Sequence, residues 1–218
     1  MSSPKKIEQL KKELGQCKLL AVSKTYPVEK ILEAYHIGQR LFGENRVQEL
    51  CEKQPRLPAD VEWHQIGSLQ TNKVKYIAPF VSLIHSVESQ KLLVEINRQA
   101  ERNNRTINCL LQMHIAVEET KQGLDKRELE ELLNSTEYSG MKNIQICGLM
   151  GMATNTYNQE QVRKEFSGLC QLFNELKGSH FANQPRFTEL SMGMSSDYKI
   201  AIEEGSTMVR IGSAVFAD

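Results

Sequence analysis

Short apolar runs alternate with longer amphipathic stretches along the chain, and this alternation is the clearest structural signal in the sequence. In the longer stretches apolar residues recur at helical spacing, as at Val28, Ile31 and Tyr35. The apolar runs have the length of strands and recur roughly every 27 residues, close to one strand–helix unit. We expect strands at residues 18–23, 40–43, 62–67, 81–85, 108–115, 144–150, 187–191 and 208–212.

Two architectures fit this alternation, a closed (β/α)8 barrel and an open, doubly wound α/β sheet. An open sheet that binds dinucleotides would carry Gly-x-Gly-x-x-Gly after the first strand, and no such motif follows residues 18–23. Eight units usually need about 250 residues, so the 218 residues present fit if the loops are short. We therefore predict a single α/β domain over residues 1–218, a TIM-type barrel with an extra N-terminal helix in residues 1–17 packed on it.

Composition and charge narrow the class of protein. The chain has 27 Lys and Arg against 27 Asp and Glu, so its net charge is zero with His neutral. Nucleic-acid-binding proteins normally carry a basic excess, and no apolar run approaches the roughly 18 residues of a membrane span. The five cysteines are scattered without a Cys-x-x-Cys pair, which favours free thiols in a reducing compartment. We expect a cytoplasmic protein with neither nucleic acid nor membrane as a partner.

Lys24 directly follows the first expected strand. The chemistry of a barrel lies at the carboxyl ends of its strands, so this amine would face the barrel mouth. Partial desolvation there would favour the neutral amine, a nucleophile suited to Schiff-base chemistry. The alternative is an ordinary solvated lysine at a strand end.

Small and hydroxylated residues follow the last two strands, where barrels commonly bind phosphate. Ser195 follows the seventh strand, and Gly212 and Ser213 follow the eighth. Backbone N–H groups, hydroxyls and a helix N-terminus can bind an anion there, although plain capping and turn formation explain the same residues. Arg210 lies inside the apolar eighth strand, where it would either face a ligand or pair with a carboxylate such as Glu204.

Three histidines lie near the ends of successive strands and raise the possibility of a metal site. They are His64, His85 and His114. There is no His-x-His pair, and the side chains need not converge, so hydrogen bonding to neighbouring residues is the alternative.

Six segments match one known family in order along nearly the whole chain. They are LLAVSKT at 19–25, FGENRVQE at 42–49, WHQIGSLQTNK at 63–73, GLM at 148–150, LSMGMS at 190–195 and GSTMVRIGS at 205–213. In these segments the sequence resembles the pyridoxal phosphate homeostasis protein family, single-domain relatives of the fold-type III enzymes. The resemblance implies a barrel like the N-terminal domain of alanine racemase, with pyridoxal 5'-phosphate (PLP) as cofactor.

The resemblance also implies roles for individual residues. Lys24 would form the internal aldimine with PLP, and Arg210 would face the pyridine nitrogen. The residues implied to hold the phosphate are Ser195, Gly212 and Ser213, and those implied to line the pocket are Asn45 and His64. His114 stands where the family often has Asn, which leaves the contribution of the fifth strand open.

The chemistry of the implied site favours a carrier over an enzyme. An always-cationic arginine disfavours a proton on the pyridine nitrogen, and the ring is then a weaker electron sink. We expect a monomeric PLP-binding protein of intracellular PLP (vitamin B6) and amino-acid homeostasis, without efficient turnover, with PLP-dependent apo-enzymes as candidate partners. The alternatives are a PLP-dependent amino-acid racemase, with Tyr26 or His64 as second base, and a metal-dependent barrel hydrolase.

Overall fold

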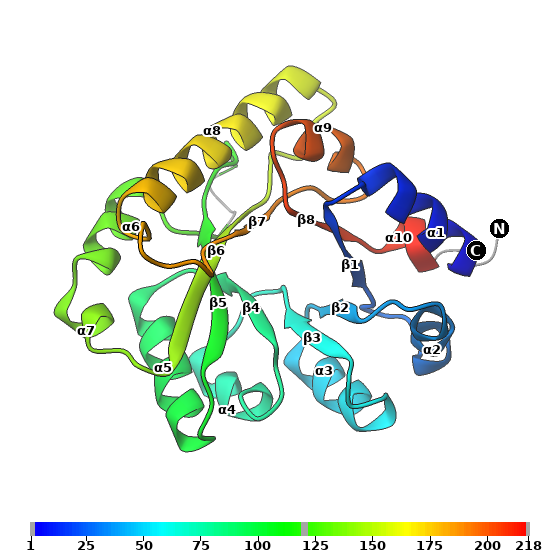
Figure 1. The fold of residues 1–218 in the computed structure, drawn as a ribbon, viewed down its shortest axis with the longest axis horizontal. Helices are drawn as coiled ribbons and strands as arrows, with labels where there is room; N and C mark the ends of the chain where they lie inside the picture. Colours follow the sequence, from blue (N-terminus) through cyan, green and yellow to red (C-terminus); the bar gives the residue numbers. More distant parts are fainter. Residues whose placement is uncertain (1–2, 119–121, 217–218) are drawn as a thin grey trace.

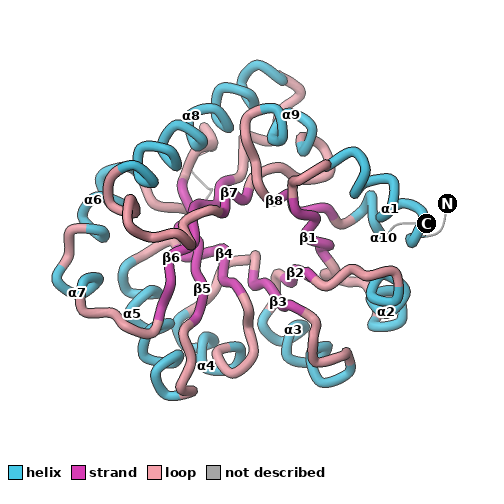
Figure 2. The backbone as a smooth tube through the Cα atoms, in the orientation of Figure 1, coloured by secondary structure: helices cyan, strands magenta, loops and turns pink. Residues whose placement is uncertain are grey.

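Eight parallel strands close into a barrel in the computed structural model, which describes residues 3–118 and 122–216. The strands are β1 (Lys18–Val22), β2 (Leu41–Glu44), β3 (Glu62–Gln65), β4 (Leu83–Val87), β5 (Ile107–Met113), β6 (Ile144–Gly151), β7 (Glu189–Ser191) and β8 (Met208–Ile211). Strand β1 pairs with β2 on one side and with β8 on the other, where Leu19 lies opposite Val209. The strands form the central ring in Figure 2. The predicted barrel is confirmed, and each strand begins and ends within two residues of its expected range.

Helices surround the ring of strands (Figure 1). They are α1 (Ser3–Leu14), α2 (Val28–His36), α3 (Val47–Lys53), α4 (Val74–Ile77), α5 (Gln90–Arg102), α6 (Lys126–Leu133), α7 (Thr136–Ser139), α8 (Gln159–Gly178), α9 (Tyr198–Glu203) and α10 (Ser213–Phe216), with two short 3-10 helices, η1 (Gln54–Arg56) and η2 (Thr71–Lys73). Over residues 3–118 and 122–216, no helix combines the length and the apolar character that crossing a membrane requires.

The extra helix α1 packs on the outside of the barrel, against β1, α2 and α10. Its buried residues Ile7, Leu10 and Leu14 recur at helical spacing and form one apolar face. The helix ends at Leu14, before the expected end at residue 17, because Gly15 adopts a left-handed conformation with φ 59°.

The core has two layers because successive side chains of a strand point to opposite faces. The larger layer lies between strands and helices and includes stacked rings of Phe181 and Phe187, with centroids 4.1 Å apart. The smaller layer fills the barrel interior with Leu20, Leu110 and Met208, among others. Burial of these two layers fixes the ring of strands and directs the strand-end residues to a common face.

Candidate functional site

A cavity of about 540 Å³ lies at the carboxyl ends of the strands, a size suited to a small organic ligand. Its walls come from residues on β1, β5 and β8 and from the segments that follow β1, β2, β3, β5, β6, β7 and β8. Seven of the residues singled out in the sequence line this cavity: Lys24, Tyr26, Asn45, Ser195, Arg210, Gly212 and Ser213. The barrel therefore brings together residues that lie as far apart in the sequence as Lys24 and Ser213.

Lys24 lies in a tight turn after β1, in which Tyr26 N donates to Ser23 O over 3.1 Å. Thr25 completes the turn with a positive φ of 67°, which is unusual for a residue other than glycine. The side chain of Lys24 is exposed at the cavity, so the expected desolvation of its amine is wrong for this structure. The reason is that the packed strand ends at Val22 and the lysine lies one turn beyond it.

A buried ion-pair network supports this turn from below. Lys53 Nζ donates to Glu44 Oε1 and to Ser23 O, both over 2.8 Å, and to Glu49 Oε1 over 2.6 Å. Ser23 Oγ donates to Glu44 Oε1, and Thr25 N donates to Glu49 Oε1, both over 2.6 Å. Burial raises the pKa of Glu44, which is completely buried. One ammonium group thus ties helix α3 to the turn that carries Lys24.

Lys53 is not among the site residues predicted from the sequence. A signal for it exists, because Val47, Leu50 and Lys53 are three residues apart on the buried face of α3. A lysine on an otherwise apolar helical face needs a buried partner. The spacing alone could not have shown that the partners include the strand-end turn.

The segments after β7 and β8 form an anion-sized cradle of hydroxyls and amides. Ser213 Oγ donates to Ser195 Oγ over 3.2 Å, and the first amides of α10 at Ser213 and Ala214 have no acceptor among the described residues. A Cβ at Gly212 would lie 3.0 Å from Val22 O, so only glycine lets these two strand ends approach without strain. Hydroxyls and free amides at a helix N-terminus fit a phosphate group.

Arg210 lies at the inner wall of the cavity with only 4% of its surface exposed. Its Nη1 donates to Ser191 O and Ser191 Oγ, both over 2.8 Å, and its Nη2 donates to Gly151 O over 3.0 Å. Burial lowers the pKa of Arg210 to about 10, and the guanidinium therefore stays protonated at neutral pH. Neutral oxygen atoms thus hold a buried cation beside the cavity, where it can face an electronegative ligand atom.

The proposed pairing of Arg210 with Glu204 is wrong. Glu204 lies at the end of α9 and accepts from Arg163 Nη1 over 2.6 Å. The sequence did not show that Glu204 follows a helix on the outside of the barrel, whereas Arg210 points inward.

His64 does not line this cavity, which corrects the expectation from the sequence. Its Nδ1 lies 2.9 Å from His85 Nε2 inside the barrel, and its ring reaches a smaller cavity of about 360 Å³ at the amino ends of the strands. Ile66, which directly follows β3 and lies two residues beyond His64, lines the cavity at the carboxyl ends instead.

The three histidines considered for a metal site do not come together. His114 Nε2 lies 3.1 Å from Glu118 O and borders a separate cavity, away from the bonded pair His64 and His85. In the part of the chain that the structure describes, no group of three or more His, Cys, Asp or Glu residues is placed to hold a metal ion. The geometry gives no support to the metal-dependent hydrolase.

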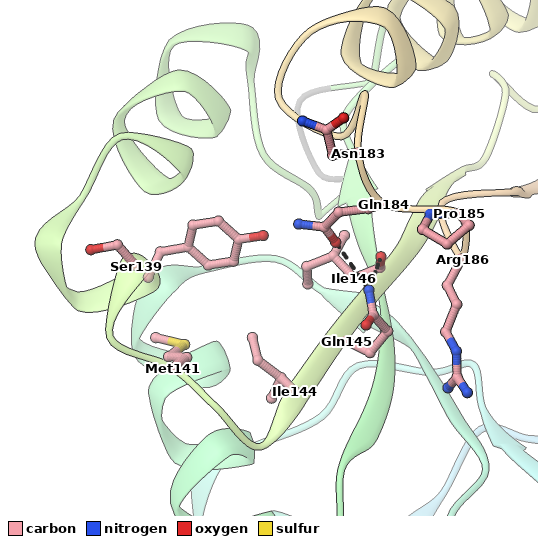
Figure 3. A pocket seen from close by; sticks show the side chains of 10 residues that line it. Ser139, Met141, Ile144, Gln145, Ile146, Asn183, Gln184, Pro185 and Arg186 are labelled. Carbon is pink, nitrogen blue, oxygen red and sulfur yellow. Dashed lines mark hydrogen bonds between the residues drawn. The ribbon is translucent and has the colours of Figure 1, made fainter.

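Another cavity, of about 480 Å³, lies between the end of α7, the start of β6 and the segment before β7 (Figure 3). It contains none of the residues singled out in the sequence. Within it, Gln145 Nε2 donates to Gln184 Oε1 over 3.0 Å, so two of its amides already bind each other. The cavity at the carboxyl ends is therefore the candidate site.

Comparison with known proteins agrees with this geometry. The family model "Alanine racemase, N-terminal domain" matches residues 5–218. The pyridoxal phosphate homeostasis protein of Aquifex aeolicus is 44% identical over 202 residues, which cover 92% of this chain and 86% of that protein. This chain belongs to the pyridoxal phosphate homeostasis protein family. The family member of Pasteurella multocida is 37% identical and covers 96% of this chain and 90% of its own.

Solved structures show the same fold in this family. PipY of Synechococcus elongatus without PLP has a TM-score of 0.92 and 36% identity, covering 99% of this chain and 100% of PipY. PipY with PLP bound has a TM-score of 0.88 and 37% identity over the same share of both chains. Alanine racemase of Bartonella henselae is only 16% identical, with a TM-score of 0.74 and 58% of its chain covered, and it shares the fold alone.

Proposed function

We propose that this chain binds PLP in the cavity at the carboxyl ends of its strands and acts in intracellular PLP (vitamin B6) and amino-acid homeostasis. The observation that carries the proposal is one cavity that combines the amine of Lys24, the hydroxyl and amide cradle near Ser195, and the buried cation Arg210. The structure of PipY with PLP bound, which shares 37% of its sequence with this chain, supports the choice of ligand.

Each group of the cavity has a proposed part in binding. The Nζ of Lys24 attacks the aldehyde carbon of PLP, a carbon–nitrogen double bond forms, and the aldehyde oxygen leaves as water. Ser195, Gly212 and Ser213 hold the phosphate, and Arg210 faces the pyridine nitrogen. Asn45 lies half-buried in the cavity wall, where its amide can hydrogen-bond the ligand.

The surroundings of Arg210 support the proposal that the protein holds the ligand without efficient turnover. Strong electron withdrawal by PLP needs a protonated ring nitrogen, which a carboxylate partner would stabilise. Arg210 is a cation whose hydrogen bonds go to Gly151 O and Ser191, so it disfavours that proton. The ring would then accept electrons weakly, which suits a carrier.

We further propose that residues 1–218 act as one PLP-binding domain, as a monomer in the cytoplasm. One family model spans residues 5–218, and helix α1 packs directly on the barrel. PLP-dependent apo-enzymes are the proposed recipients of the ligand.

The first test is covalent attachment at Lys24. After incubation with PLP, the protein is expected to absorb visible light, and borohydride should fix a pyridoxyl adduct on Lys24 that peptide mass spectrometry locates. Lys24→Ala should remove that adduct, because Lys24 is the only lysine among the described residues that line the cavity. The matched control is Lys91→Ala, an exposed lysine on α5 outside the cavity, which should keep it. A protein that stays colourless with PLP would contradict the proposal.

The same preparation separates the carrier from a racemase. Tyr26 lines the cavity together with Lys24, so two proton-transfer groups are present there. Sustained racemisation of an amino acid, measured by chiral chromatography and lost in both Lys24→Ala and Tyr26→Phe, would replace the carrier by a racemase.

A further inference from the structure

A continuous chain of hydrogen bonds crosses the barrel interior. It runs from the cavity at the carboxyl ends of the strands, which we call the upper cavity, to the cavity at their amino ends, which we call the lower cavity. Arg210 Nη1 donates to Ser191 Oγ over 2.8 Å, and Ser191 Oγ lies 3.1 Å from His85 Nδ1. His85 Nε2 then lies 2.9 Å from His64 Nδ1. All four side chains are buried, with at most 4% of any residue exposed. We call Ser191, His85 and His64 the interior relay.

The direction of each hydrogen bond in the interior relay can be worked out. Arginine only donates, so Ser191 Oγ accepts from Arg210. The hydroxyl hydrogen of Ser191 needs an acceptor, and within residues 3–118 and 122–216 the only one in reach is His85 Nδ1. His85 therefore carries its proton on Nε2 and donates it to His64 Nδ1, so the proton of His64 is on Nε2.

Both histidines must be neutral for this order to hold, and burial makes them so. Burial, with the nearby Lys18, lowers the pKa of His64 to about 3. Burial, His64 and Arg210 together lower the pKa of His85 well below its usual value. Lys18 at the lower end of the relay and Arg210 at its upper end are the charged groups that lower these two pKa values. Lys18 is also ion-paired with Glu189, and Glu62 and Arg186 border the same cavity as His64. Asp197 acts on Arg210 and raises its pKa.

We infer that the interior relay positions Arg210 while leaving its charge intact, so that the cation, and not a neutralised ion pair, faces the ring nitrogen of bound PLP. This inference rests on the proposed function. A carboxylate in the place of Ser191 would also bind the guanidinium, but it would cancel the charge that the cavity presents. Ser191, backed by the two neutral rings, accepts a hydrogen bond from the buried guanidinium of Arg210 and adds no negative charge.

The lower end of the relay opens to the lower cavity, at the amino ends of the strands. Among the described residues, none accepts from His64 Nε2, and His64 borders that cavity. The Nε2–H of His64 therefore has a place where a water molecule or another acceptor can bind it.

The relay can be tested without PLP. Nitrogen-15 NMR of the histidine side chains should show His64 and His85 neutral and protonated on Nε2 from pH 7.5 down to pH 5, with His64→Gln and His85→Gln used to assign the signals. A proton on Nδ1 of either ring, or a charged ring at pH 6, would overturn the inferred order.

The effect on the ligand is tested with Ser191→Ala, with Ser191→Thr as the conservative variant. Ser191→Ala should keep the borohydride-trapped adduct on Lys24, because Lys24 is untouched. It should weaken PLP binding by about tenfold, the cost of about one lost hydrogen bond to a charged group. It should also shift the pH midpoint of the visible absorption of bound PLP, and Ser191→Thr should restore both.

Ser86→Ala is the matched control, because Ser86 is also a buried strand serine but its Oγ has no hydrogen-bond partner among the described residues. It should leave affinity and pH midpoint unchanged. If Ser191→Ala matches Ser86→Ala in both measurements, the relay does not position Arg210. If the parent protein forms no adduct, the proposed function fails, and the NMR measurement still decides the order of the relay.

Discussion

Lys53 stabilises the turn that carries Lys24, although it does not itself line the cavity. Its ammonium group, with 8% of the side chain exposed, contacts a buried carboxylate and the backbone of the turn that carries Lys24. Glu44 is completely buried, and one of its oxygens already lacks a hydrogen-bond partner among the described residues. Removing the ammonium would therefore leave a buried carboxylate without the one cation that pairs with it among the described residues.

We predict that Lys53→Met destabilises the protein by about 3–5 kcal/mol, the usual cost of breaking a buried ion pair from one side. The change should also weaken PLP binding, because the turn at Lys24 loses its support. Urea denaturation followed by circular dichroism measures the first effect, and titration of the visible absorption measures the second.

Lys126→Met is the control for that experiment. Lys126 Nζ lies 3.6 Å from Glu175 Oε2, and both side chains are mostly exposed, so this pair contributes little to the stability of the protein. Equal losses of stability in the two variants would show that the buried network has no special role.

At the scale of elements, the connection from β7 to α9 fixes the position of Ser195 in the cradle of hydroxyls and amides. Gly193 turns the chain with φ 94°, and a Cβ there would lie 2.5 Å from the Cβ of Ala201 on α9. The turn is closed by Asp197, whose Oδ1 accepts from Met194 N. Ser195 therefore reaches the cavity only if this turn keeps its glycine conformation.

We predict that Gly193→Ala lowers stability by more than about 1 kcal/mol, since the added methyl meets both a clash and an unfavourable φ. PLP affinity should fall with it, because Ser195 moves away from Ser213 and the start of α10. Thermal unfolding and PLP titration check the two effects.

Gly178→Ala is the matched control for that substitution. Gly178 ends helix α8, and a Cβ there has no atom within 4 Å. Alanine should be neutral or stabilising at this site by up to about 1 kcal/mol, through a more restricted unfolded chain. If Gly193→Ala behaves like Gly178→Ala, the turn does not depend on glycine.

For the whole molecule, the two neutral histidines at the centre of the barrel make stability depend on pH. In the unfolded chain a histidine binds a proton below about pH 6.5, whereas in the folded protein burial lowers the pKa of His64 to about 3. The pKa of His85 is also lowered well below its usual value. The unfolded state therefore binds more protons between these values, and stability falls as pH decreases.

We predict a loss of about 1.4 kcal/mol for each of the two histidines between pH 7.5 and pH 5.5. Urea unfolding at these two pH values measures it. The double variant with His64→Gln and His85→Gln should lose this dependence, whereas an unchanged slope would mean that the buried rings do not carry it.

The local pattern of apolar and polar residues determined the strands of this protein and part of its candidate site. The alternation of apolar runs and amphipathic stretches predicted every strand of the barrel, because strand and helix periods are properties of neighbouring residues. The residues after β1, β7 and β8 could be singled out for the same reason, since a parallel barrel brings all carboxyl ends to one face.

The tertiary structure alone decided which strand residues face the cavity and which partners they have there. His64 lies on β3 and Ile66 directly follows that strand, yet only Ile66 lines the cavity at the carboxyl ends, because depth in the barrel depends on the register of all the strands. His85 meets Ser191 across 106 residues of sequence, and Lys53 meets Ser23 across 30. Such contacts form only when the barrel closes, because closure sets the distances between strands that no local pattern records.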